Sequence, residues 1–342
     1  MDEREKAPVS ASSRRAEKRR LKKEAKRAKK RARRGSRYEA DGAALKGTLV
    51  ALLIIIAFCA VLAGIIWLCG GFEPDAESQG AAALEEGTVK VHFIDVGQAD
   101  CVLIECADGA ILIDAGENDD SQKIAAYLNE RGIKRLNYVI GTHAHSDHMG
   151  GMDDVILQYR VDELIIPTKA SGEKFYSDVI SAAKSKNVPA RTASEGETLK
   201  FQTGKLEVLD DGSELLDDLN DNSYILKFTY GETTFLFTGD AGDNYEREMI
   251  SKRESLDVDV LQVAHHGSRS STCMEFIAAT TPEHAVIQVG RDNSYGHPSK
   301  DTVSRLVRAG AGVYRNDELG DIVVTTDGKN ISITYDKQGG KR

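Results

Sequence analysis

The stretch His143-Ala-His145-Ser-Asp147-His148 decides the fold class of this chain. It follows the apolar run 137–142, which is typical of a buried strand, and glycines come soon after it. Three His and one Asp at these places would occur by chance on the order of 3 × 10⁻⁴ times in a chain of this His content. Imidazole and carboxylate groups on one tight turn are the ligands that borderline divalent metals take. The stretch therefore predicts a metal-binding loop, with a solvated polar loop as the alternative.

Strand-like apolar runs and helical periods alternate on both sides of this loop. Strands are expected at 89–96, 101–105, 110–114, 137–142, 163–167, 205–209, 224–230, 233–238, 258–264, 284–289, 322–326 and 331–335, and helices at 122–131, 153–159, 174–185, 244–252, 273–279 and 300–309. Gly231-Glu232 and Asp327-Gly328 match hairpin turns. Hairpins near both ends with helices between them favour an α+β or layered α/β fold.

The histidine stretch matches the H-x-H-x-D-H signature of the metallo-β-lactamase fold, and further matches extend over residues 88–336. These are Asp114 for the first motif, Thr238-Gly239-Asp240 for the bridging Asp, and His265-His266-Gly267-Ser268 for the last histidine motif. Asp95-Val96-Gly97-Gln98 and Tyr295-Gly296-His297-Pro298 resemble the extracellular hydrolase domain of the ComEC competence proteins. The resemblance implies an α/β fold of the αββα sandwich kind.

The resemblance also implies a metal centre of one or two divalent ions, Zn²⁺ or Mn²⁺. The implied ligands are His143, His145, Asp147, His148, Asp240 and His265. One ion would take Asp147, His148, Asp240 and His265, and the other would take His143, His145 and the bridging Asp240. The wider fold places one more histidine between the central motifs, but no His occurs between His148 and His265. Asp221, Asn222 or Ser223 lies near that place, and more oxygen ligands would favour Mn²⁺.

Other residues receive roles in catalysis or in support of the ligands. Asp147 or Asp240 would orient the attacking hydroxide and accept its proton, and His297 would bind or protonate the leaving group. Five residues are expected to hold the ligands in place or to line the substrate pocket: Gln98, Asp114, Asn222, His266 and Arg269. Asp100 is expected with Gln98 at the pocket mouth. By analogy with the fold that the chain resembles, His265, the first histidine after the apolar run, is favoured over His266 as the ligand.

A second long apolar run precedes this domain. Residues 47–69 are 23 residues without a charge, and about 20 apolar residues cross a bilayer core of about 30 Å. We expect a single transmembrane helix there, with a buried core helix or a cleaved signal peptide as the alternatives. Residues 1–46 are rich in Lys and Arg, which predicts a cytoplasmic tail and an extracytoplasmic domain. Residues 70–87 are predicted to be a linker.

The charge distribution separates the tail from the rest of the chain. Residues 1–46 hold 18 Lys and Arg against 7 Asp and Glu, a formal charge of +11, and the remaining residues hold 27 against 47, a charge of −20. The tail is expected to contact anionic lipids of the inner leaflet, or else only to set topology. The acidic body argues against broad, non-specific affinity for nucleic acid, because phosphate chains are bound by Lys and Arg.

The expected activity is metal-assisted hydrolysis of an ester. A phosphodiester is favoured, and the ComEC resemblance implies DNA degraded outside the cell during uptake. Three alternatives remain open: a non-phosphate ester, lactone or lactam; a cell-wall phosphodiester; and a metal-binding module without turnover. The sequence indicates no oligomeric state.

Overall fold

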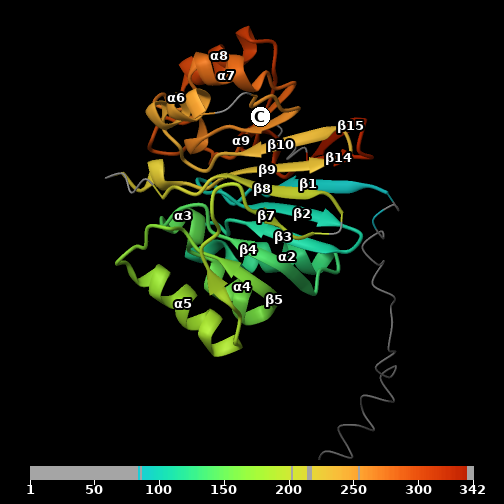
Figure 1. Ribbon diagram of the computed structural model, residues 1–342, viewed down its shortest axis with the longest axis vertical. Coiled ribbons are helices and arrows are strands. Elements are labelled where there is room, and N and C mark those ends of the chain that lie inside the picture. Colours follow the sequence, from blue (N-terminus) through green and yellow to red (C-terminus); the bar gives the residue numbers. More distant parts are fainter. Residues whose placement is uncertain (1–83, 85–86, 202, 214–217, 253–254, 337–342) are drawn as a thin grey trace, which may run out of the picture. The chain divides into compact units, whose positions relative to one another are not determined.

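The computed structural model describes residues 84, 87–201, 203–213, 218–252 and 255–336 (Figure 1). These residues belong to the compact unit Ser78–Arg342. The predicted basic tail 1–46, the predicted transmembrane helix 47–69 and most of the predicted linker 70–87 lie outside the described residues. Among the residues that are described, no helix combines the length and the apolar character needed to cross a membrane.

Two sheets form the centre of the unit. The first contains eight strands in the order β15 (Ile331–Tyr335), β14 (Ile322–Thr326), β1 (Val89–Phe93), β2 (Val102–Cys106), β3 (Gly109–Ile113), β4 (Arg135–Ile140), β5 (Arg160–Ile165) and β6 (Ala190–Arg191). The second contains seven strands in the order β13 (Gly312–Arg315), β12 (His284–Ile287), β11 (Val260–Gln262), β10 (Thr233–Phe237), β9 (Ile225–Tyr230), β8 (Lys205–Asp210) and β7 (Thr198–Leu199). Each sheet has an antiparallel part and a parallel part, with β3 to β6 parallel in the first and β10 to β13 parallel in the second.

The sheets pack face to face because their strands alternate two apolar faces. In β2, Val102 and Ile104 point into the core between the sheets, whereas Leu103 points to the outer face. Phe93, Phe235 and Phe237 in the inner core are fully buried. Each contributes about 1.5–3 kcal/mol relative to an exposed side chain.

Helices cover both outer faces. The first sheet is covered by α2 (Ser121–Glu130), α4 (Met152–Gln158) and α5 (Lys174–Lys186), and the second by α6 (Asp243–Lys252), α7 (Met274–Thr280) and α8 (Lys300–Arg308) (Figure 1). The unit is therefore a mixed α/β sandwich of two sheets, as the expected αββα arrangement requires.

Several local expectations differ from the structure. The expected strand 258–264 ends as β11 at Gln262, because the chain then enters a short turn in which His265 and His266 have φ angles of 52° and 51°. The short helices α3 (Ser146–Met149) and α9 (Asn316–Leu319) and the strands β6, β7 and β13 were not expected. They are two to four residues long, too short for a period to emerge.

The ends of four strands meet at one edge of the sandwich. In the first sheet β3 leads to Asp114 and β4 leads to the His143–His148 loop. In the second sheet β10 leads to Asp240 and β11 leads to the turn at His265. The backbone N–H of Tyr224 donates to the carbonyl oxygen of Thr142 at 2.9 Å and joins the two sheets at this edge.

Candidate metal centre

Asp114 holds the histidine loop in place through hydrogen bonds to Thr142 and His148. Its backbone is left-handed, with φ 57°, and its side chain is 1% exposed. One carboxylate oxygen accepts from the backbone N–H of Thr142 at 2.8 Å, and the other accepts from the Thr142 hydroxyl at 2.7 Å and from Nδ1 of His148 at 2.8 Å. The bond to Nδ1 leaves Nε2 of His148 directed at its other neighbours. A carboxylate that orients a histidine in this way is typical of metal sites.

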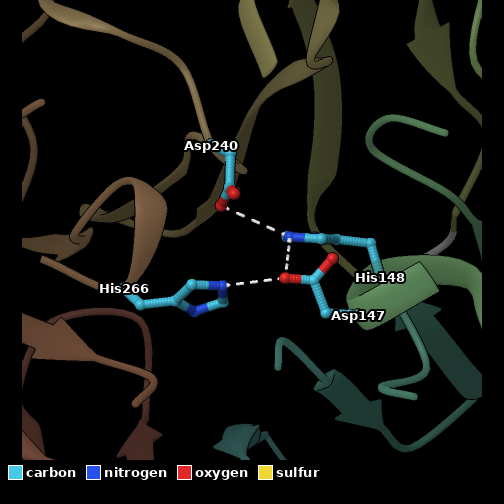
Figure 2. Close-up of side chains that lie close together, drawn as sticks. All are labelled: Asp147, His148, Asp240 and His266. Carbon is cyan, nitrogen blue, oxygen red and sulfur yellow. Dashed lines mark hydrogen bonds and ion pairs between the residues drawn. The ribbon is translucent and has the colours of Figure 1, made fainter. Parts of the chain in front are cut away.

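Asp147, His148, Asp240 and His266 form a four-residue cluster whose ligand atoms all lie within 4.8 Å of one another (Figure 2). Nε2 of His148 lies 3.3 Å from Oδ1 of Asp240 and 3.9 Å from Oδ2 of Asp147. Nε2 of His266 lies 3.3 Å from the same Asp147 oxygen. Figure 2 shows that Asp147 and His148 approach from one element while Asp240 and His266 come from separate loops.

Two atoms of the cluster test whether these residues fit a divalent metal. Nε2 of His148 and Oδ1 of Asp240 are buried and have no hydrogen-bond partner within the described part of the chain. A buried polar atom left unpaired costs about 1–3 kcal/mol. A divalent cation between a neutral imidazole nitrogen and a carboxylate oxygen would satisfy both atoms, and nitrogen and oxygen ligands of this kind suit Zn²⁺ and Mn²⁺. The residues of the cluster therefore fit a divalent metal ion.

The pKa shifts show that the cluster attracts positive charge. Burial alone would lower the pKa of His148, but the carboxylates of Asp240, Asp114 and Asp147 outweigh it and raise that pKa well above its ordinary value. The pKa of His266 is raised in the same way, against burial, by Asp240 and Asp100. Burial opposes ionisation of Asp240 too, yet His148 and His266 hold its pKa well below the ordinary value. The site therefore stabilises cationic groups even though it is buried.

The second oxygen of Asp240 faces a different set of histidines. Oδ2 lies 4.0 Å from Nε2 of His143 and 3.7 Å from Nε2 of His265. Nε2 of His143 in turn lies 3.0 Å from Nδ1 of His145. Burial and the neighbouring His148 lower the pKa of His143 well below its ordinary value, so its imidazole is neutral. Asp240 thus directs Oδ1 toward His148 in the four-residue cluster and Oδ2 toward His143 and His265.

The structure separates His265 from His266. His266 is 3% exposed and belongs to the four-residue cluster, whereas the side chain of His265 is 28% exposed and contacts the other oxygen of Asp240. The two rings are 6.2 Å apart at an angle of 72°. The strand has ended at Gln262, and the turn that follows directs the two side chains apart. The preference for His265 as a metal ligand stays a prediction.

Asp100 lies behind the cluster instead of at a pocket mouth. It is 2% exposed, and its Oδ1 lies 3.3 Å from Nδ1 of His266. Its Oδ2 accepts from Nε2 of Gln262 at 2.6 Å, and Nδ1 of His266 also lies 3.0 Å from the carbonyl oxygen of Gln288. Sequence reasoning missed Gln262 and Gln288. A signal was present for Gln262, because a polar residue interrupts the apolar run 258–264.

The remaining predicted residues lie at different distances from the centre. The Nε2 of Gln98 lies 3.5 Å from Nδ1 of His297, whose ring is 5.5 Å from that of His265. Burial, with His265 and His266, lowers the pKa of His297. Arg269 points to solvent and lies 3.2 Å from a carboxylate oxygen of Asp301. Arg269 therefore forms an ion pair with a residue of α8.

The segment expected to replace the missing histidine supplies a supporting contact. The amide of Asn222 donates to the carbonyl oxygen of Asp218. The next residue, Ser223, accepts from the backbone N–H of Asp240 at 3.2 Å and donates to the carbonyl oxygen of Asn220 at 2.7 Å. Ser223 thus holds the backbone of Asp240, a role that was not assigned to it.

Comparison with known proteins identifies the family to which the chain belongs. A sequence profile of the metallo-beta-lactamase superfamily matches residues 94–291. ComE operon protein 3 of Bacillus subtilis (strain 168) is 29% identical over 251 residues, which cover 68% of this chain and 32% of that protein. Competence protein ComA of Neisseria gonorrhoeae is 28% identical over 281 residues, which cover 78% and 38%.

A solved structure, the metallo-beta-lactamase fold protein YhfI from Bacillus subtilis, is 13% identical with a TM-score of 0.43, over 66% of this chain and 95% of that one. The chain spans about a third of the length of the two competence proteins. It resembles competence proteins of the ComEC type over that part. Because the profile covers more than half of the chain and includes every residue of the four-residue cluster, the chain belongs to the metallo-beta-lactamase superfamily.

Proposed function

We propose that this chain is a membrane-anchored, metal-dependent phosphodiesterase that degrades DNA during uptake, as in competence systems of the ComEC type. The observation that carries the proposal is a pair of buried atoms, Nε2 of His148 and Oδ1 of Asp240, which lie 3.3 Å apart and have no hydrogen-bond partner among the described residues. The named competence relatives support the choice of DNA.

The two oxygens of Asp240 suggest how two ions would be shared. Asp147, His148, His266 and Oδ1 of Asp240 would hold one ion, and His143, His145 and Oδ2 of Asp240 would hold the other. His265 lies on the side of the second group, at 3.7 Å from Oδ2, and would supply the ligand that the missing histidine leaves open. Ions bound in such a pair make hydroxide available at neutral pH and offset the charge that develops on a phosphoryl group.

Three side chains of the protein would have separate roles in hydrolysis. A water oxygen bonds to phosphorus, one P–O ester bond breaks, and the leaving oxygen takes a proton. The side chain of Asp147 is 28% exposed and His148 holds its pKa below the ordinary value despite burial, so its carboxylate is ionised and reachable by water. It would orient the attacking water and accept its proton, with Asp240 as the bridging carboxylate. His297 would contact the leaving group.

The membrane part of the proposal rests on the sequence. The uncharged stretch 47–69 would anchor the chain, with the basic tail 1–46 against anionic lipids in the cytoplasm and the hydrolase domain outside. Protease added to intact spheroplasts is expected to digest the hydrolase domain and to spare an epitope at the N-terminus. Digestion of the epitope alone would show that the chain has the opposite orientation in the membrane.

Hydrolysis of a generic phosphodiester by the purified full chain tests the activity. It is run metal-free, with Mn²⁺ and with Zn²⁺, beside Asp147→Ala and the surface control Asp178→Ala, which removes an exposed ion pair with Lys174. Metal-restored turnover that Asp147→Ala abolishes and Asp178→Ala retains is expected. Tight metal binding without phosphodiester turnover would refute the proposal, and parallel assays with a carboxylic ester and a lactam would then separate a different hydrolase from a non-catalytic module.

A further inference from the structure

An exposed aromatic side chain lies beside the metal centre and has no part in the chemistry described so far. Tyr295 is 73% exposed, the highest value for a large hydrophobic side chain among the described residues. One face of its ring stacks on His297, with centroids 5.8 Å apart and planes at 27°. A tyrosine ring held from one side and open on the other offers a free π surface.

The loop that carries Tyr295 is held in place by its own hydrogen bonds. The Asn293 side-chain oxygen accepts from the backbone N–H groups of Tyr295 and His297 at 3.2 and 3.0 Å. The Asn293 amide donates to the carbonyl oxygens of Gly290 and His297 at 2.9 and 2.6 Å. The loop backbone that carries the ring is therefore ordered before any ligand binds, which lowers the entropic cost of stacking on the ring.

The same loop is fastened to the turn that carries the ligands. The backbone N–H of Ser299 donates to the carbonyl oxygen of Gly267 at 2.8 Å, and a Cβ at Gly267 would come within 2.6 Å of Pro298. The His297 ring lies 5.5 Å from that of His265 and 6.4 Å from that of His266. Tyr295 is thus one aromatic ring away from the histidines of the metal centre, on the side where His265 is accessible.

Three arginines near the centre already contact other groups of the protein. Arg291 and Arg305 donate to backbone carbonyl oxygens, and Arg269 lies 3.2 Å from a carboxylate of Asp301. Residues 47–342 carry a formal charge of −20. The metal centre and contacts to bases would therefore have to supply much of the affinity for a nucleic acid. Base stacking on aromatic side chains provides about 1–3 kcal/mol per base.

We propose that Tyr295, backed by His297, is a stacking platform for the nucleobase next to the scissile phosphate, and that the substrate is accordingly a single-stranded nucleic acid. The base faces of a duplex are covered by their neighbours, whereas those of a single strand are open to an aromatic ring. This inference rests on the proposed phosphodiesterase function and adds the substrate class to it.

The test compares an oligothymidine with an abasic strand of equal length, using the full chain, Tyr295→Ala, Tyr295→Phe and the control Tyr335→Ala, which removes an exposed tyrosine from β15. Tyr295→Ala is expected to lower kcat/KM for oligothymidine about 5- to 150-fold, mainly through KM. On the abasic strand, Tyr295→Ala is expected to stay within about twofold of the starting protein. Tyr295→Phe and Tyr335→Ala are expected to stay within about twofold of it on both strands. A similar loss on both strands, or no loss on oligothymidine, would overturn the platform.

A binding measurement separates this inference from the activity on which it rests. Dissociation constants for the two labelled strands are measured by fluorescence polarisation in EDTA, where no hydrolysis occurs. Tighter binding of oligothymidine than of the abasic strand, lost in Tyr295→Ala, supports the platform even if no phosphodiester is cleaved. Equal binding of both strands by the starting protein refutes it even if cleavage is observed.

Discussion

At the candidate metal centre, two histidines of the four-residue cluster each lie against a buried carboxylate. Asp114 holds His148 at 2.8 Å, and Asp100 lies 3.3 Å from His266 in the corresponding place on the other side of the cluster. Both carboxylates are buried and contact the ring nitrogen that faces away from the cluster. They fix which nitrogen is presented to a cation and make it a better ligand.

Replacement of Asp100 by Asn tests this role at His266. The amide keeps the shape but removes the charge behind Nδ1, so we expect metal affinity to fall about 10- to 100-fold. Competition with a chromophoric chelator measures it, with Asp178→Asn on the surface as the matched control. Unchanged affinity in Asp100→Asn would contradict the role assigned to the carboxylate and leave it only a contact to Gln262.

The two adjacent histidines should have separable effects on metal content. His266 belongs to the four-residue cluster, so His266→Ala is expected to weaken binding of the ion at that cluster at least tenfold. His265 faces only Oδ2 of Asp240, so His265→Ala is expected to retain that ion and to lower the content from two ions per chain to one. Elemental analysis after gel filtration measures both. His284→Ala, which removes a histidine in edge-on contact with Tyr314, is the control. Identical losses of metal in the two variants would argue against two separate groups of ligands.

At the scale of elements, Glu246 on α6 holds the segment between the ligand turn and α7. Its carboxylate is 1% exposed and accepts from the backbone N–H groups of Thr272 and Cys273 at 2.5 and 2.8 Å. Glu246→Ala leaves both buried donors unpaired, so the free energy of unfolding near pH 6 should fall by about 2–4 kcal/mol. Urea denaturation measures it. Glu248→Ala, which removes a half-buried ion pair with Lys252, should cost under about 1 kcal/mol.

The same carboxyl group predicts a pH dependence. Burial raises the pKa of Glu246 to about 7, although the N–H groups of Cys273 and Thr272 oppose the shift. The folded protein therefore keeps this proton at pH values where the unfolded chain has lost it. The stability that this group contributes is fully present below about pH 4.5 and declines as the pH rises through 7, by at most about 1.4 kcal/mol per unit. The difference in unfolding free energy between the starting protein and Glu246→Ala should narrow from pH 5 to pH 8. A constant difference would show that the group is ionised throughout.

For the whole molecule, the long periodic segments and the polar residues that follow strands were predictable from the sequence. The contacts between segments far apart in the chain were not. Helix α5 and the β9–β10 hairpin lie within one residue of their expected limits because many residues share one period. The choice between His265 and His266 depends on two left-handed residues that no local pattern reveals. Asp100 becomes a support for His266 only because β1, β2 and β11 bring residues 162 and more positions apart into contact, as its bond to Gln262 shows.

Metal binding should stabilise the entire sandwich because the ligands come from both sheets. Asp147 and His148 follow β4 in one sheet, whereas Asp240 and His266 follow β10 and β11 in the other. A ligand that binds only the folded state at 1,000 times its Kd adds about 4 kcal/mol, and 1 kcal/mol corresponds to about 2–4 °C for a domain of this size. Returning Zn²⁺ or Mn²⁺ to EDTA-treated protein should therefore raise Tm by roughly 8–16 °C in calorimetry. Asp240→Ala removes the carboxylate that faces both groups of histidines and should abolish the rise, while Asp178→Ala should keep it. If Tm is the same with and without metal, or if the rise persists in Asp240→Ala, the ion does not bind where the two sheets meet.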